Sequence, residues 1–156
     1  MKKYIYYLTF GILLIDQMVK YFVVQNIVLS EVISVIPNFF YLTYVKNTGG
    51  AWSLFHSIPY LLIMISFVFL IFMNRYILKI KEFSLIEIIS YGFLMGGVLG
   101  NLIDRVLVSG VIDYIGFQFG SYYYPIFNLA DIFIVLGMVL IIMKEFGGFK
   151  NEHSRG

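Results

Sequence analysis

The sequence contains no cysteine and few charged residues. Of its 156 residues only 13% are charged, and the formal net charge is +2. Without cysteine the chain can form neither a disulfide nor a thiolate metal site, and it has no thiol nucleophile. The charge is small and no dense cluster of lysine and arginine occurs, which argues against nucleic acid as a partner.

Several catalytic motifs are missing as well. The two histidines, His56 and His153, do not form an H-E-x-x-H pattern, which argues against a zinc protease. The stretch with Gly49 and Gly50 lacks the Lys-Ser/Thr tail of a phosphate-binding loop. The G-x-S-x-G pattern of serine hydrolases is absent too. We therefore expect no metal site and no cofactor.

Apolar residues dominate what remains. They make up 60% of the chain, and the mean hydropathy is +0.88, which is typical of an integral membrane protein. A helix needs about 20 mainly apolar residues to cross a bilayer. Four segments qualify and predict one membrane domain over residues 1–156, with spans at about 4–28, 58–78, 85–107 and 126–143. The first is too long for a cleaved signal peptide and lacks a small-residue cleavage site.

Lysine and arginine predict the orientation of these spans. Eight of them fall on the side that holds both termini, and three on the other, so both termini should be cytoplasmic. Residues 29–57 and 108–125 then face outward. They alternate β-branched and aromatic residues between glycines, which predicts a small sheet on the membrane surface, with ordinary interfacial loops as the alternative. The expected fold class is thus an all-α, four-helix membrane bundle with a small outward-facing sheet.

Polar residues cluster toward the outward side of the expected spans. An ionisable group inside a membrane helix costs roughly 3 kcal/mol or more. Random tolerance would scatter such residues over both leaflets, so their clustering indicates a functional site near the outer face. The set comprises Asp16, Lys20, Asn47, Asn101, Asp104, Arg105, Asp113, Asn128 and Asp131.

Some of these residues have ordinary structural interpretations. Asp16 and Lys20 are four residues apart and can form an ion pair on one helical face. Asn128 precedes a helical run and is a good N-cap candidate. The glycines within residues 96–100 have the spacing that lets membrane helices pack closely. Glu87 lies near the start of the expected span at 85–107, where a negative charge is favourable because of the helix dipole.

Asp113 and Asp131 are harder to explain structurally, because neither has a lysine or arginine at helical spacing. If the last two spans pack as an antiparallel pair, the two carboxyls can converge and share one proton. An aspartic protease uses such a pair. The alternative is a small proton- or ion-coupled transport protein, which should carry polar residues through the full membrane thickness. The spans at 58–78 and 126–143 are almost purely apolar in their cytoplasmic halves, which favours the protease.

Five motifs, in order, resemble the lipoprotein signal peptidases, the type II signal peptidases of bacteria, over nearly the whole chain. These motifs are DQMVK, NTGGAW, GGVLGNLIDRV, GVIDYI and FNLADIFI. Three positions depart from the usual family pattern. Val19 stands in place of Ser or Thr, Gly50 in place of the commoner Ala, and Gly116 where an Asp or Asn often occurs.

The resemblance implies an aspartic endopeptidase of the bacterial cytoplasmic membrane that cuts prolipoproteins just before a diacylglyceryl-modified cysteine. Its implied partners are lipid-modified prolipoproteins, membrane lipids and the cyclic peptide antibiotics that inhibit the family. It also implies a sheet that cradles the substrate and an extracellular loop that acts as a lid. The catalytic positions fall on Asp113 and Asp131. The substrate-binding positions are Asn47, Gly49, Asn101, Arg105 and Asn128, and the structural ones are Asp16, Lys20, Gly97 and Asp104.

Overall fold

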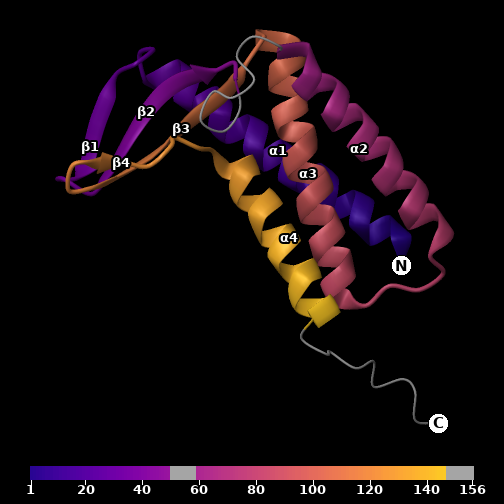
Figure 1. Cartoon of the computed structure of the whole chain (residues 1–156). Coiled ribbons are helices and arrows are strands. Elements are labelled where there is room, and N and C mark those ends of the chain that lie inside the picture. Colours follow the sequence, from indigo (N-terminus) through magenta and orange to yellow (C-terminus); the bar gives the residue numbers. More distant parts are fainter. Residues whose placement is uncertain (50–58, 147–156) are drawn as a thin grey trace.

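The computed structural model describes residues 1–49 and 59–146, and the expectations for Gly50, His56 and His153 lie outside these ranges. Figure 1 shows the strands gathered at one end of the helices, with the N-terminus at the other. The elements follow one another as α1 (Lys2–Asn26), β1 (Val32–Ile36), β2 (Phe40–Asn47), α2 (Pro59–Lys79), α3 (Leu85–Val108), β3 (Val111–Phe119), β4 (Tyr122–Tyr123) and α4 (Leu129–Phe146).

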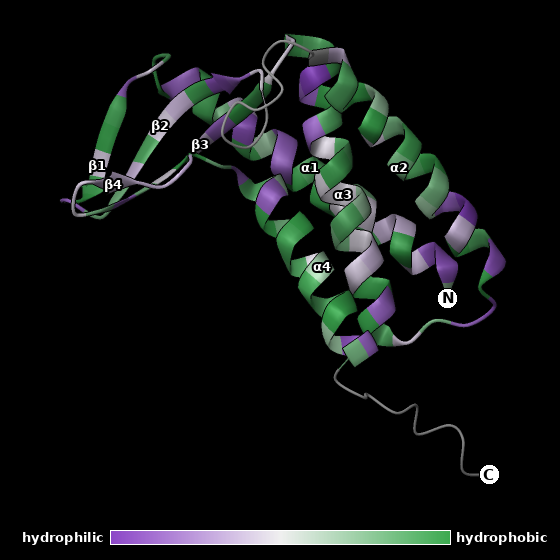
Figure 2. Ribbon diagram, viewed as in Figure 1, coloured by the Kyte–Doolittle hydropathy of each residue, from purple (hydrophilic) through white to green (hydrophobic). Residues whose placement is uncertain are grey.

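Three helices in the described ranges are long and apolar enough to cross a membrane, namely α1, α2 from Tyr60 onward, and α3. Large apolar side chains on α2 point outward; Val68 and Phe72, for example, are each 66% exposed. Figure 2 shows α2 hydrophobic along most of its length. Such a surface is unfavourable in water and suits lipid, so the chain is a multi-pass membrane protein. The expected fourth span, α4, is not among these three helices, because it has only 18 residues and carries three charged ones.

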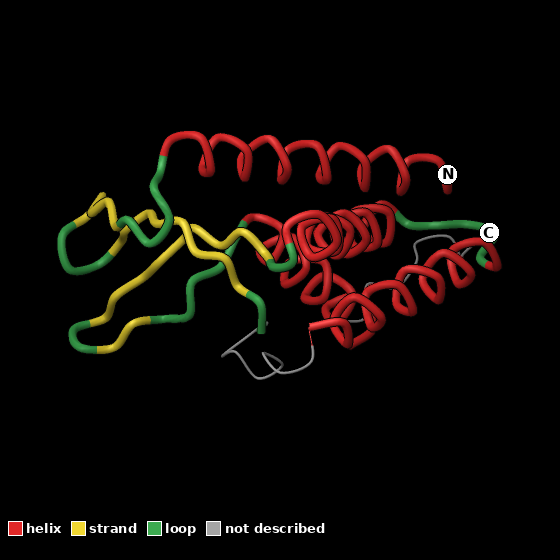
Figure 3. The backbone as a smooth tube through the Cα atoms, turned by 90° about the horizontal axis from the view of Figure 1, so that it is seen from above, coloured by secondary structure: helices red, strands yellow, loops and turns green. Residues whose placement is uncertain are grey.

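Helix α3 packs against both α1 and α4 through glycines. A Cβ atom at Gly96 would lie 2.7 Å from side-chain carbons of Ile12 on α1. A Cβ atom at Gly97 would lie 2.5 Å from the carbonyl oxygen of Ala130 on α4. Only a residue without Cβ permits these approaches, which confirms the packing role expected for this glycine stretch. Figure 3 shows α1 running from the N-terminus alongside the other helices to the strands.

The end of the bundle away from the sheet is tied by Glu87. Its carboxylate accepts a hydrogen bond from the backbone N–H of Ser84 at 2.8 Å, and the Ser84 hydroxyl accepts one from the N–H of Glu87 at 3.4 Å. This reciprocal capping box starts α3. Glu87 also forms a 2.5 Å ion pair with Lys144 near the end of α4. Glu87 therefore does more than the helix-terminal charge predicted from the sequence.

The four strands form one antiparallel sheet in the order β1-β2-β3-β4. The predicted sheet is thus confirmed, and the alternative of two interfacial loops is wrong. Residues 122–128, which follow β3, form β4 and a bridge between Ile115 and Phe127, so α4 starts three residues later than the expected span. The other three helices agree with the expected spans to within two residues. The first four residues of β3 are buried beside the helices, and they carry Asp113.

Candidate active site

The start of α4 holds Asp131 in a defined position. The Oδ1 atom of Asn128 accepts a hydrogen bond from the N–H of Asp131 at 3.0 Å. In return, Oδ2 of Asp131 accepts one from the N–H of Asn128 at 3.2 Å. This reciprocal arrangement confirms Asn128 as the N-cap and fixes the Asp131 carboxyl in the first turn of the helix.

Two further N–H groups at this helix start also donate to side chains. The N–H of Leu129 donates to the hydroxyl oxygen of Tyr114 on β3 at 3.2 Å. The N–H of Ala130 donates to Oδ1 of Asp16 on α1 at 3.1 Å. The first N–H groups of a helix have no partner within it, so these acceptors satisfy them and fix α4 relative to β3 and α1. The sequence contained no signal for the role of Tyr114 beyond its place next to Asp113.

Two side-chain amides, those of Asn128 and Asn101, connect the two expected catalytic carboxyls. Nδ2 of Asn128 donates to Oδ1 of Asp113 at 2.6 Å and to Oδ1 of Asn101 at 3.1 Å. Nδ2 of Asn101 in turn donates to Oδ1 of Asp131 at 2.8 Å. Asn128 is fully buried, and Asp113 is 2% exposed. The two aspartates, 18 positions apart in sequence and on different elements, therefore belong to one hydrogen-bonded network.

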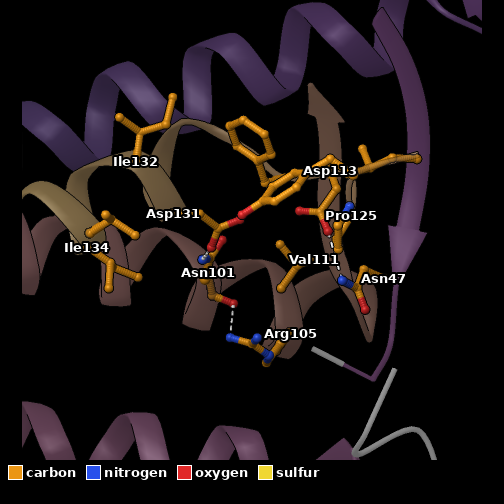
Figure 4. A pocket seen from close by; sticks show the side chains of 13 residues that line it. Asn47, Asn101, Arg105, Val111, Asp113, Pro125, Asp131, Ile132 and Ile134 are labelled. Carbon is orange, nitrogen blue, oxygen red and sulfur yellow. Dashed lines mark hydrogen bonds between the residues drawn. The ribbon is translucent and has the colours of Figure 1, made fainter. Parts of the chain in front are cut away.

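The second oxygen of Asp113 is held from β2. Nδ2 of Asn47 donates to Oδ2 of Asp113 at 2.8 Å, as Figure 4 shows. The N–H of Gly49 donates to Oδ1 of Asn47 at 3.1 Å, which turns the amide nitrogen of Asn47 toward the carboxyl. Gly49, expected in the substrate site, is buried and is not among the described residues that line the cavity. Its contribution is the orientation of Asn47.

Both carboxyls line one cavity of about 470 Å³, a size typical of small-ligand sites. Asp113 reaches it from β3 and Asp131 from α4 (Figure 4). The other lining residues with amide or charged side chains are Asn47, Asn101 and Arg105. Val111 of β3 and mainly apolar residues of the β4–α4 connection and of α4 form the remainder. In the ranges 1–49 and 59–146, no group of three or more histidine, aspartate or glutamate residues could hold a metal ion.

Arg105 lies on the cavity wall and is half-buried. Its Nη1 donates to the backbone oxygen of Asn101 at 3.3 Å. Among the residues that the structure describes, its guanidinium forms no ion pair, and the neighbouring Asp104 binds Lys20 instead. Most of the five N–H donors of Arg105 therefore remain available to a ligand in the cavity.

A buried ion cluster lies behind the cavity. The Nζ atom of Lys20 is 2.8 Å from Oδ2 of Asp16, which confirms the ion pair predicted from their spacing. It is also 2.8 Å from Oδ2 of Asp104, 84 positions along the chain, which the sequence did not predict. The same Asp104 oxygen accepts a hydrogen bond from the N–H of Ile112 at 3.1 Å, so the cluster ties α1, α3 and β3 together.

The environment of Asp113 changes its acidity. Burial, together with the negative charge of Asp131, raises the pKa of Asp113 from its ordinary 3.8 to about 7. Hydrogen bonds from Asn47 and Asn128 and the charge of Lys20 act in the opposite direction without cancelling this effect. Asp113 can therefore gain or lose a proton near neutral pH, as a carboxyl that works as a general acid must.

The sequence profile of a family described as signal peptidase II matches residues 8–147. The chain belongs to the signal peptidase II family. Membership makes it an aspartic peptidase. It is 40% identical over 147 residues to a lipoprotein signal peptidase of Listeria welshimeri serovar 6b, and the match covers 92% of this chain and 93% of the relative.

Solved structures agree with this assignment. A bacterial membrane enzyme solved at 2.3 Å resolution superposes with a TM-score of 0.85 at 28% sequence identity, covering 97% of this chain and 93% of the other. A second bacterial membrane enzyme, solved at 1.9 Å, gives a TM-score of 0.80 at 30% identity and covers 91% and 92%. The whole arrangement of helices and sheet is therefore that of known membrane enzymes.

Proposed function

We propose that this protein removes signal peptides from diacylglyceryl-modified bacterial prolipoproteins, cutting just before the lipidated cysteine, with Asp113 and Asp131 as its catalytic pair. The observation that carries the proposal is that both carboxyls line one cavity and are joined through buried Asn128, whose Nδ2 donates to Asp113 and whose backbone N–H donates to Asp131. The name of the Listeria relative, a lipoprotein signal peptidase, supports the substrate class.

In the proposed reaction, Asp113 is the protonated member and Asp131 the ionised one. The raised pKa of Asp113 favours its protonated form. Asp131 accepts N–H groups of Asn101 and Asn128 and stands in the first turn of α4, where the helix dipole favours negative charge.

The proton transfers then follow from these two states. Asp131 takes a proton from a water whose oxygen bonds to the carbonyl carbon of the scissile peptide. Asp113 gives its proton to the carbonyl oxygen. When the C–N bond of the tetrahedral intermediate breaks, Asp131 returns its proton to the leaving amine, and Asp113 recovers its own from the hydroxyl that becomes a carboxyl oxygen.

The remaining polar residues act in two ways under this proposal. The Nδ2 groups of Asn47, Asn101 and Asn128 already donate to the carboxyls, so we assign them the task of orienting the catalytic pair. Arg105 has donors available and is the residue that would bind peptide carbonyls or a lipid phosphate. The cyclic peptide inhibitors of the family would compete for the same cavity.

We also propose that α4 is a fourth membrane crossing, with both termini in the cytoplasm and the cavity toward the outer face of the bacterial cytoplasmic membrane. Its 18 residues span about 27 Å, close to the roughly 30 Å of a hydrocarbon core. Apolar side chains along it are exposed, Val135 at 52% and Ile142 at 54%, as expected for contact with membrane lipids. The excess of lysine and arginine toward the termini supports this orientation.

The test of this proposal is cleavage by the purified protein in detergent or lipid. One synthetic prolipoprotein peptide would carry a diacylglyceryl thioether on its cysteine, and a matched peptide would carry the free thiol. We expect mass spectrometry to show cleavage directly before the lipidated cysteine, and much slower cleavage of the unmodified peptide. Failure to cut the lipidated peptide would contradict the proposal, and ion movement across proteoliposomes without cleavage would favour a transport protein.

A further inference from the structure

The ammonium group of Lys20 has a third partner besides its two ion-paired carboxylates. Lys20 is 1% exposed, and its Nζ atom donates to Oδ1 of Asn101 at 3.1 Å. An ammonium has three N–H donors and no acceptor. Asp16, Asp104 and Asn101 therefore account for all three donors, and the third leads to the cavity.

This contact determines which way the Asn101 amide points. Its Oδ1 accepts hydrogen bonds from Lys20 and from Nδ2 of Asn128, so its Nδ2 faces Asp131. Figure 4 shows the resulting contact between Asn101 and Asp131. The reversed amide would set its N–H groups against an ammonium and its oxygen against a carboxylate. Because Lys20 cannot accept a hydrogen bond, it excludes that reversed state.

We propose that Lys20 is a positioning residue for Asp131, acting through the amide of Asn101. The inference rests on the proposed function, because it assumes that Asp131 is catalytic. It goes beyond the ion pair with Asp16 expected from the sequence, and beyond a purely structural account in which Lys20 only neutralises Asp16 and Asp104. The two accounts differ in what the donor toward Asn101 does, so they can be separated by experiment.

The first experiment compares Lys20→Met, which removes the donor, with Lys20→Gln, which keeps one. Both are made together with Asp104→Asn, because removing Lys20 alone would leave two buried carboxylates without a cation. In these two double variants Asp16 is the only charged member of the cluster, so their net charge of −1 equals that of the wild-type cluster with Asp16, Lys20 and Asp104 all ionised. The reference protein carries Asp104→Asn alone. Activity is measured as kcat and KM on the lipidated peptide, per folded protein.

We expect Lys20→Met to lower kcat about 100-fold relative to this reference, a loss that a displacement of a reacting group by about 1 Å can cause, with little change in KM. Lys20→Gln should recover at least a tenth of the reference kcat. If both variants lower the melting temperature alike and leave kcat per folded protein unchanged, Lys20 is only structural and the inference is overturned.

A double-mutant cycle tests the route through Asn101. If Lys20 acts through this amide, Lys20→Met added to Asn101→Ala should lower kcat no further than Asn101→Ala alone. Additive losses would contradict the proposal. The matched control removes the ion pair at the far end of the bundle by Lys144→Met with Glu87→Gln, which should lower the melting temperature and leave kcat unchanged.

Two reference measurements separate this inference from the proposed function. Failure of the wild type to cut the lipidated peptide, or full activity of Asp131→Asn, would refute the proposed function and this inference with it. If the wild type cuts and Asp131→Asn is inactive, an unchanged kcat in Lys20→Met refutes the role of Lys20 alone.

Discussion

Replacing Asp113 with asparagine should stabilise the folded protein increasingly as the pH rises, although it removes a catalytic group. The pKa of Asp113 is raised from 3.8 to about 7 in the folded protein, so the folded state binds this proton more tightly than the unfolded state. The corresponding stability is fully present below pH 4 and is lost as the pH rises through about 7. Asparagine carries no charge and does not incur this loss.

The size of this stability change follows from the pH range in which Asp113 is protonated in the folded state but ionised in the unfolded state. Between pH 5 and the folded pKa of about 7 lie two units, each worth 1.36 kcal/mol, and little further change occurs above pH 8. The advantage of Asp113→Asn over the wild type should therefore grow by about 2–3 kcal/mol from pH 5 to pH 8. The amide also loses one acceptor toward Asn47 or Asn128, at a cost of about 1–3 kcal/mol, but this offset is the same at both pH values.

Thermal unfolding in detergent at pH 5 and pH 8 measures this difference. For a chain of this length, 2–3 kcal/mol corresponds to roughly 5–10 °C in the relative melting temperature. Glu145→Gln, at a carboxylate that is 65% exposed, controls for the loss of a negative charge as such. If the advantage of Asp113→Asn does not grow with pH, Asp113 does not hold its proton near neutral pH, and its role as the acid is wrong.

Three further predictions concern binding, metals and packing. Arg105→Lys should raise KM with a smaller change in kcat, because one ammonium cannot reproduce the planar donors of a guanidinium. If Arg105→Ala instead leaves KM unchanged and greatly lowers the melting temperature, the residue is structural. Metal chelators should not affect cleavage, since no suitable ligand group occurs in the described part of the chain; inhibition that added zinc reverses would reveal a missed site. Gly100→Ala should lower stability by about 1–3 kcal/mol, because its Cβ would collide with the Asp16 carboxylate. Gly11→Ala, where a Cβ meets no atom within 4 Å, should cause no loss in the same melting experiment.

Hydrophobic length and local spacing explain what could be predicted from the sequence. Long apolar runs located the helices, and alternating β-branched and aromatic residues located the strands. The pair of Asp16 and Lys20 was predictable because residues four apart on a helix are neighbours whatever the helix packs against. Asn128 was predictable as an N-cap for the same reason, since capping is a local property of the chain.

Contacts between elements could not be predicted in this way. The binding of Asp104 to Lys20 depends on the packing of α1 against α3, and nothing in the local pattern of either residue indicates it. The capping of α4 by Tyr114 and Asp16 likewise requires three elements to meet. The same limit applies to Asn47, Asn101 and Asn128: the sequence did not predict that their amide nitrogens donate to the two carboxyls, and their expected contact with substrate stays a prediction.

The central claim, that Asp113 and Asp131 form the catalytic pair, is tested most directly by the rate of cleavage of one lipidated prolipoprotein peptide by three proteins. These are the wild type, Asp113→Asn and Asp131→Asn, each shown by its melting temperature to be folded. An amide can neither take nor give the proton, so each substitution should lower kcat by about three to five orders of magnitude. Near-normal cleavage by either folded variant would contradict the assignment of that residue.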